Sequence, residues 1–208
     1  MIADLVRSAD RERWLAVQYA PAAVRPALLA LHALDLELAK VVDTTTEPML
    51  GEIRLAWWRE RLEGLDKGQV PAQPVLQALA TEVLPRGVTG AVLAGFEDAW
   101  LLRLGGDEVA AAQGRGRALF AAMAVLLGGD PVAAGALGET WAAGDAARYG
   151  LDGVALAPAR AATALRPLAG LAALGARDHA RAAAGLPIEL RATPVRQLIL
   201  LRGAVFGR

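Results

Sequence analysis

The stretch ALHALDLELAKVVDTTTEPMLGEIRLAWWRERL, residues 30–62, predicts two helices that meet at a short turn over residues 43–47. Thr46 has the character of an N-cap, Glu47 adds an acidic first turn, and Pro48 is an early helix proline. At helical spacing the adjacent Trp57 and Trp58 point about 100° apart. We therefore expect one tryptophan in the core and the other nearer an edge.

The same start signals recur along the rest of the chain. Asp130-Pro131 opens a helix to about residue 149, and Thr193-Pro194 opens the last helix. Breaks rich in glycine and proline delimit further predicted helices at about residues 11–20, 22–42, 75–84, 90–104, 108–127 and 167–184. No segment shows the sustained period-2 alternation of a half-buried strand. The sequence predicts an all-α fold, and because no linker divides it, a single domain over residues 1–208.

Composition restricts the classes of partner and compartment. Lys+Arg 22 balance Asp+Glu 22, so no net positive field favours binding of nucleic acid. The longest apolar runs, such as residues 119–127, reach about half of the roughly 20 residues that a membrane span needs. The absence of cysteine fits a reducing compartment, and residues 1–12 contain no apolar segment typical of a secretory signal. We expect a cytoplasmic protein that binds no nucleic acid.

Three runs carry a resemblance to a known family: DRERWLAVQYAP (10–21), LLALHALDLELAKVVD (28–43) and EPMLGEIRLAWWRERL (47–62). Together they resemble the opening of squalene/phytoene synthase family members. Two later runs, LGETWAAGDAARYGLDG (137–153) and ARDHARAAAGLPIELRATP (176–194), extend the resemblance more weakly over most of the chain. The resemblance implies a helical bundle of the isoprenoid (terpenoid) synthase type.

Active members of that family join two prenyl diphosphates, and Mg²⁺ held by two aspartate clusters neutralises the departing pyrophosphate. Carried over, the consecutive aspartates of the first cluster fall on Ala39 and Lys40, which leaves Asp43 as the only carboxylate. A lysine beside one aspartate opposes Mg²⁺ binding. The first cluster is therefore degenerate in this chain.

The second cluster is degenerate as well. Its two aspartates fall on Tyr149 and Gly153, and its basic position falls on Arg148. Asp145 and Asp152 lie close by, so a shift of one residue in the alignment restores one ligand and not both. We predict no catalytic residue, no metal site and no cofactor; Mg²⁺ enters only under the alternative of an active prenyltransferase.

The resemblance is closest in character to a degenerate branch of the family that acts in respiratory-complex biogenesis. This branch implies a binding or assembly factor and not an enzyme. Its expected partners are respiratory-complex subunits, and a retained cavity for a prenyl or lipid ligand is a further expectation. The alternative is a working Mg²⁺-dependent prenyltransferase of isoprenoid biosynthesis.

Two sets of polar residues are candidates for a site. His32, Asp35, Asp43, Asp145 and Tyr149 are candidates to line a residual polar cavity, although solvated faces and helix ends are the interpretation we favour for the carboxylates. His32 lies among leucines, which favours a core or edge histidine over a catalytic base. The second set of candidates consists of three arginines: Arg54, Arg59 and Arg148. They are candidates to bind a diphosphate or a lipid headgroup, although exposed solubilising arginines are the interpretation we favour.

The C-terminal segment is basic and apolar. Acidic residues are absent after Glu189, while four arginines follow it, at positions 191, 196, 202 and 208. We favour a last core helix. The alternative is an amphipathic helix that makes a peripheral contact with an anionic membrane, such as the inner membrane.

Overall fold

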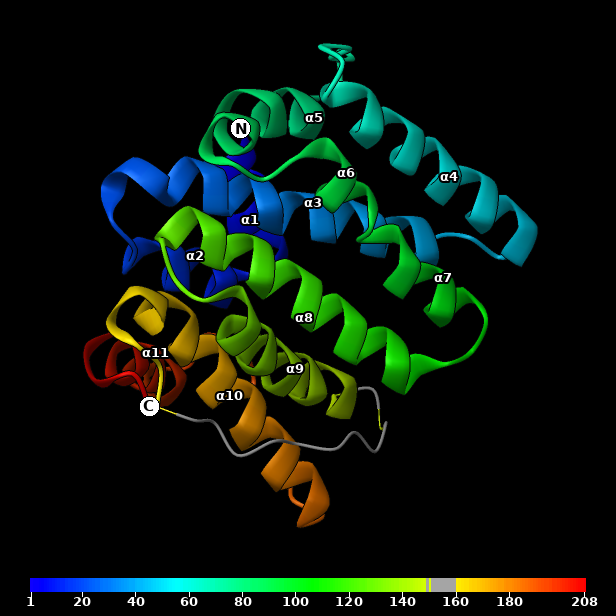
Figure 1. The fold of residues 1–208 in the computed structure, drawn as a ribbon. Coiled ribbons are helices and arrows are strands. Elements are labelled where there is room, and N and C mark those ends of the chain that lie inside the picture. Colours follow the sequence, from blue (N-terminus) through cyan, green and yellow to red (C-terminus); the bar gives the residue numbers. More distant parts are fainter. Residues whose placement is uncertain (149, 151–159) are drawn as a thin grey trace.

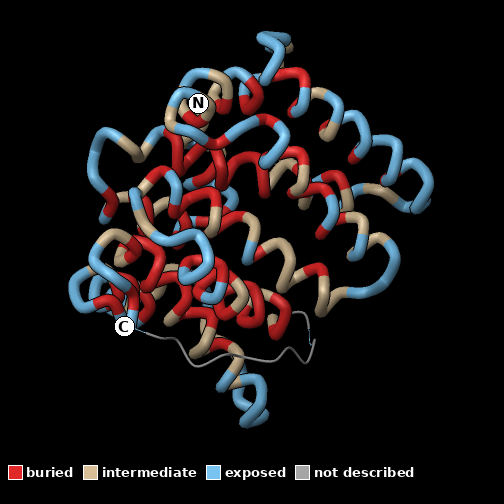
Figure 2. The backbone as a smooth tube through the Cα atoms, viewed as in Figure 1, coloured by how far each residue is buried: buried red, intermediate tan, exposed pale blue. Residues whose placement is uncertain are grey.

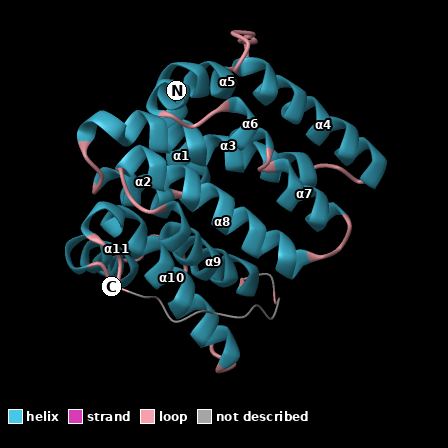
Figure 3. Cartoon of the chain, viewed as in Figure 1, coloured by secondary structure: helices cyan, strands magenta, loops and turns pink. Residues whose placement is uncertain are grey.

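The computed structural model describes residues 1–148, 150 and 160–208. Within these residues the regular structure is helical and no strand occurs (Figure 3). The predicted all-α fold is confirmed. No helix among the described residues is long and apolar enough to cross a membrane.

The helices follow one another as a layered bundle (Figure 1). In the second half of the chain α8 packs on α9, α9 on α10, and α10 on α11. Helices α3 and α7 also pack on α8, and α1, α2 and α4 pack on α3. The α-helices are α1 (Ile2–Ala9), α2 (Arg11–Gln18), α3 (Arg25–Asp43), α4 (Pro48–Leu65), α5 (Pro74–Ala78), α6 (Gly90–Ala94), α7 (Glu97–Leu104), α8 (Glu108–Leu127), α9 (Pro131–Ala147), α10 (Arg166–Ala183) and α11 (Pro194–Phe206).

Helix boundaries follow the predicted caps in most places. The helix over residues 108–127 is confirmed at both ends, and Asp130 caps α9 by accepting from the backbone N–H of Val132 at 2.9 Å. The N-cap of α4 is Glu47 and not Thr46, so that prediction was wrong by one residue. Pro48 then occupies the first helical position, as expected.

Other predicted boundaries were wrong for identifiable reasons. The helix expected at 90–104 is divided into α6 and α7 at Gly95, and the helix expected at 75–84 ends at Ala78 in a π-helical turn, Leu79–Val83. Helix α1 was not predicted. Its apolar residues Ile2, Leu5 and Val6 recur at helical spacing and pack on the core, so a local signal was present and was overlooked. Val6 is its buried residue, and α1 packs on α3.

Glycine pairs set how closely the last helices approach. A Cβ on Gly116 of α8 would overlap the carbonyl oxygen of Gly138 on α9, and the reverse is also true. A Cβ on Gly144 of α9 would overlap the backbone of Gly175 on α10, and a Cβ on Gly175 would overlap the backbone of Thr140 and Trp141 on α9. Because backbones meet directly at these points, the side chains beside them are held at short range.

Burial separates the two neighbouring tryptophans of α4. Trp58 is 5% exposed and belongs to the core, whereas Trp57 is 40% exposed. The rings meet edge to face, with centroids 5.3 Å apart and planes at 85°. The expectation of one core and one edge tryptophan is confirmed, and the outer face of α4 lies at the exposed rim of the bundle (Figure 2).

Candidate functional site

A buried carboxylate on α3 is the centre of a polar network in the core. Asp35 is 1% exposed. Arg115 of α8 donates to it through Nε and Nη2, both at 2.8 Å, and Arg13 of α2 donates through Nη1 at 2.6 Å. Burial alone would raise the pKa of Asp35, but the charges of Arg115 and Arg13 outweigh burial and hold this pKa below its ordinary value.

The network continues from Arg115 to α9. Its Nη1 donates to Asp145 at 2.9 Å, and Asp145 also accepts from Arg191 in the segment before α11. Arg191 reaches Asp10 as well, and Asp10 caps α2 through the backbone N–H groups of residues 12 and 13. Burial opposes ionisation of Asp145, yet Arg115 and the neighbouring arginines keep its pKa well below the usual range.

A second set of ion pairs joins α2, α10 and α11. Arg196 is 1% exposed and its guanidinium lies between Glu12 and Asp178. Arg148, at the end of α9, donates to Asp178 at 2.6 Å and 3.0 Å. These contacts connect the start of the chain to its last helix, more than 180 residues away.

The whole network is electrically neutral. Five guanidinium groups face five carboxylates, and we call these ten residues the ion-pair network: Arg13, Arg115, Arg148, Arg191, Arg196, Asp10, Glu12, Asp35, Asp145 and Asp178. Each carboxylate already has a cationic partner. A divalent ion would have to displace arginines to gain these oxygens.

The residues that would hold Mg²⁺ in a synthase do not fit that ion here. Ala39 and Lys40 offer no anionic ligand, and the Asp43 side chain, half exposed, pairs with Arg103 at 2.8 Å. Across residues 1–148, 150 and 160–208, no group of three histidine or acidic side chains lies close enough together to hold a metal ion. The prediction of no metal site stays a prediction, because part of the second cluster lies outside these residues.

Aromatic rings enclose the guanidinium groups. The Trp141 ring lies 4.8 Å from the Arg13 carbon and 4.9 Å from that of Arg115, measured from Cζ to the ring centroid. Trp100 approaches Arg115 to 5.0 Å, and Phe120 stacks on Trp141 at 5.4 Å. Such contacts stabilise a desolvated cation and exclude water from it.

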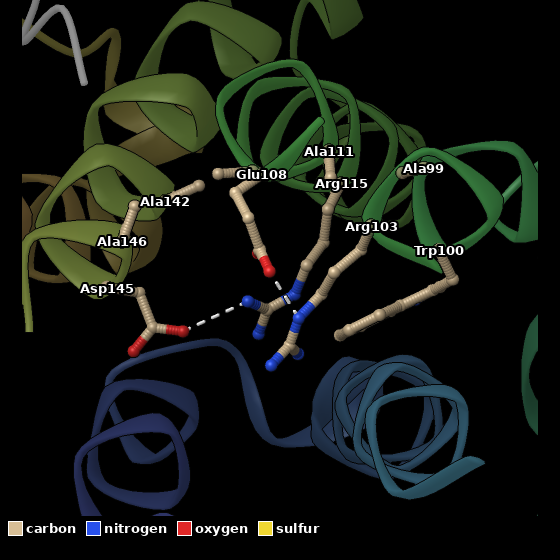
Figure 4. A pocket seen from close by; sticks show the side chains of 10 residues that line it. Ala99, Trp100, Arg103, Glu108, Ala111, Arg115, Ala142, Asp145 and Ala146 are labelled. Atoms are coloured by element: carbon tan, nitrogen blue, oxygen red, sulfur yellow. Dashed lines mark hydrogen bonds and ion pairs between the residues drawn. The ribbon is translucent and has the colours of Figure 1, made fainter. Parts of the chain in front are cut away.

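A pocket of about 190 Å³ opens above this network between α7, α8 and α9 (Figure 4). Arg115 and Asp145 close its floor, Arg103 and Glu108 pair at one side, and alanines form much of the wall. Ligand pockets for drug-sized molecules occupy roughly 300–1,000 Å³. As defined by the described residues, this pocket is too small for two prenyl chains.

The predicted cavity residues are placed differently from one another. Asp35 and Asp145 meet at Arg115, so the solvated faces favoured for these carboxylates were the wrong interpretation. Asp43 does lie at a helix end and is half exposed. His32 is buried, and Tyr149 lies outside the described residues. Among the four candidates that the structure describes, Asp145 alone lines the pocket.

The three candidate arginines are separated as well. Arg59 pairs with Glu97 and Asp98, and Arg148 belongs to the ion-pair network, so exposure was the wrong interpretation for Arg148. Arg54 is exposed and lines an open groove beside α4. The structure does not bring these three side chains together into one anion site.

Sequence reasoning missed the arginines that complete the network. Four network arginines were not candidates: Arg13, Arg115, Arg191 and Arg196. Arg115 stands between two glycines in an alanine-rich helix. An arginine among small residues in a closely packed helix is expected to be buried, and a buried arginine needs a carboxylate partner. The residues around Arg115 were therefore the signal that could have identified it.

We expect Arg115→Met to lower the free energy of unfolding by about 3–5 kcal/mol, because it leaves the buried Asp35 and Asp145 short of a counter-charge. Arg117→Met, two residues further along α8, is the matched control: its guanidinium is 66% exposed and pairs with Glu139, so the change should stay below about 1 kcal/mol. Urea unfolding followed by circular dichroism measures both. Equal small losses would show that the buried pairs contribute little.

The stability should also depend on pH through His32. Burial lowers the pKa of His32 to about 3, and the charge of Arg13 acts in the same direction. The unfolded chain binds a proton below about pH 6.5 and the folded chain does not, so this stability is complete above pH 6.5 and is lost as the pH falls toward 3. Unfolding free energies should fall by about 1.4 kcal/mol for each pH unit in that window.

His32→Leu should remove this slope between pH 6 and 4, leaving the acid sensitivity of Asp35 and Asp145 at lower pH. Denaturant titrations of both proteins at several pH values provide the comparison. Parallel curves for the variant and the original protein would show that His32 takes up its proton in the folded state.

Comparison with known proteins gives one family match and several similar proteins. Residues 6–99, less than half of the chain, match the family described as squalene/phytoene synthase, so this part of the chain is similar to that family. The family match ends at residue 99, and the resemblance of the later runs at 137–153 and 176–194 stays a prediction.

Within that class the similar proteins share one name. The chain is 32% identical over 101 residues to the rat protein named NADH dehydrogenase (ubiquinone) complex I, assembly factor 6, a match that covers 49% of this chain and 28% of the rat protein. The human protein of the same name is 35% identical over 72 residues, or 35% of this chain and 22% of its own length. The matches thus span less than a third of these relatives. No solved structure gives a significant match.

Proposed function

We propose that this chain is a non-catalytic assembly factor for an NADH dehydrogenase of the complex I type. The observation that carries the proposal is the neutral ion-pair network. In a chain that resembles a metal-dependent synthase, Asp35 and Asp145 are paired with arginines and are not free to bind a metal ion. The names of the matched relatives point in the same direction.

The chemistry of the site supports binding over catalysis. Ionisation of a prenyl diphosphate develops several negative charges on the leaving group, which requires concentrated positive charge that is free to act on it. Here the buried guanidinium groups are already neutralised by carboxylates at 2.6–2.9 Å. The network therefore holds helices together and supplies no unpaired charge to a substrate.

The first test is enzymatic and the second is genetic. Purified protein incubated with farnesyl or geranylgeranyl diphosphate and Mg²⁺ should release no pyrophosphate above the background without protein. In the source organism, deletion of the gene should lower the amount of assembled NADH dehydrogenase complex on native gels, and the original gene should restore it. Pyrophosphate release that disappears in Asp43→Ala would establish a working synthase in place of this proposal. Intact assembly in the deletion strain would also contradict the proposal.

A peripheral membrane contact through α11 is part of the same proposal. The outer face of this helix carries exposed Val195, Leu198, Leu201 and Val205, while Arg196 is turned inward to the ion-pair network. Arg202 remains exposed on the helix. Apolar burial would therefore contribute most of the binding, with a smaller electrostatic part than the sequence indicates.

Co-sedimentation with phospholipid vesicles containing anionic lipid measures this contact. Leu198→Ser with Leu201→Ser should lower the bound fraction severalfold, because both side chains are exposed and their removal leaves the folded core unchanged. Val92→Ser with Val132→Ser removes comparably exposed apolar side chains from α6 and α9 and is the control. An unchanged bound fraction in the α11 variant would exclude this face as the contact.

A further inference from the structure

Helix α4 presents a continuous apolar stripe on its outer face. Met49, Leu50, Ile53 and Trp57 are 71%, 50%, 60% and 40% exposed. Positions 49, 53 and 57 follow one another at i, i+4 spacing, so they share one side of the helix over roughly 12 Å. Single exposed apolar side chains are ordinary on protein surfaces, but a contiguous stripe marks an interaction site.

A groove of about 300 Å³ runs beside this stripe. Val41 of α3 and the rings of Trp57 and Trp58 form its apolar lining, and Lys40, Arg54 and Glu37 form its polar edge. The groove is large enough to accept anchoring side chains from a partner, which is how an amphipathic helix binds to a protein surface.

The edge of the stripe next to the groove is basic. Arg54 donates to the hydroxyl oxygen of Thr45 at 2.7 Å and to backbone and hydroxyl oxygens nearby, so its described contacts do not neutralise its charge. Helical spacing places Arg61 on the same edge, where its guanidinium carbon lies 5.8 Å from the Trp57 ring centroid and its Nη2 pairs with the exposed Glu60 at 3.7 Å. A partner with acidic residues along one side of its apolar face would complement this edge.

The opposite edge of the stripe argues against a lipid surface as the occupant. Glu52 and Glu63 are exposed on that side of α4, and Glu60 follows the end of the stripe. If Ile53 and Trp57 entered an anionic bilayer, these carboxylates would approach the headgroups and be repelled. The charge pattern instead suits a protein helix that meets both edges.

From these observations we infer that the α4 surface, defined as Met49, Leu50, Ile53, Arg54, Trp57 and Arg61, docks an acidic amphipathic helix of a partner protein. The inference rests on the proposed function, since it assigns that helix to a subunit of the complex that the chain helps to assemble.

The experiment uses the full chain, affinity-tagged, expressed in the deletion strain of the source organism. Met49→Ser with Ile53→Ser removes the stripe, and Arg54→Glu with Arg61→Glu reverses the basic edge. Each should lower the recovery of complex subunits with the tagged chain by about tenfold or more, the effect expected when anchor residues of an interface are lost. Val92→Ser with Val132→Ser, on other helices, should leave recovery within about twofold. Unfolding curves confirm that each variant folds.

A photoreactive phenylalanine analogue introduced at position 53 then identifies the occupant. A crosslink to an acidic amphipathic segment of a complex subunit supports the inference. Crosslinks to a second copy of this chain, to lipid, or to no subunit overturn it. If deletion impairs assembly but the stripe and edge variants restore assembly and subunit recovery in full, the docking surface is wrong and the proposed function stands. If deletion leaves assembly intact, the proposed function itself fails.

Discussion

The pairing of Asp35 with Arg115 and Arg13 is the constraint on which the rest of the structure depends. Asp35 is buried, and a buried carboxylate without a counter-charge would cost several kcal/mol. Satisfying it requires α2, α3 and α8 to meet at one point, and Arg115 extends the requirement to Asp145 on α9. Helices remote in sequence are thereby fixed relative to one another, and the glycine contact between α8 and α9 allows the close approach that these short ion pairs need.

The same pairing determines what the interior can do chemically. In a synthase, acidic side chains of the interior must be free to bind divalent cations, and those cations must be free to bind the diphosphate of the substrate. In this chain the charges of the core are matched among protein groups, and Lys40 stands where the family resemblance places an acid. A neutral, ring-enclosed network is suited to holding a scaffold in one shape. Under the proposed function, binding to a partner would take place on the outer surfaces.

Local signals made the fold predictable, whereas the site depended on contacts that local signals do not encode. Asp130 and Pro131 begin α9 where the sequence indicated, and the spacing of Trp57 and Trp58 predicted their different burial. In contrast, Asp35 and Arg115 are 80 residues apart, and the sequence around either residue does not identify the other as its ion-pair partner. An aspartate in a leucine-rich helix indicates that some cation must be near it, but only the packing of α3 on α8 identifies which one. Helix α1 is a different case, because Ile2, Leu5 and Val6 recur at helical spacing and the local signal for it was present in the sequence.

Internal pairing also decides which surfaces remain available to partners. The C-terminal segment is basic in sequence, yet Arg191 pairs with Asp10 and Asp145, and Arg196 is buried between Glu12 and Asp178. Helix α11 therefore presents an apolar outer face with Arg202 as its exposed cation. On α4 the reverse holds: Arg54 has polar contacts but no described carboxylate partner, and it borders an exposed apolar stripe. Two outward apolar faces with different charge patterns should therefore select different partners. The face with a cation and no acid suits a lipid surface, and the face with a basic and an acidic edge suits a protein helix.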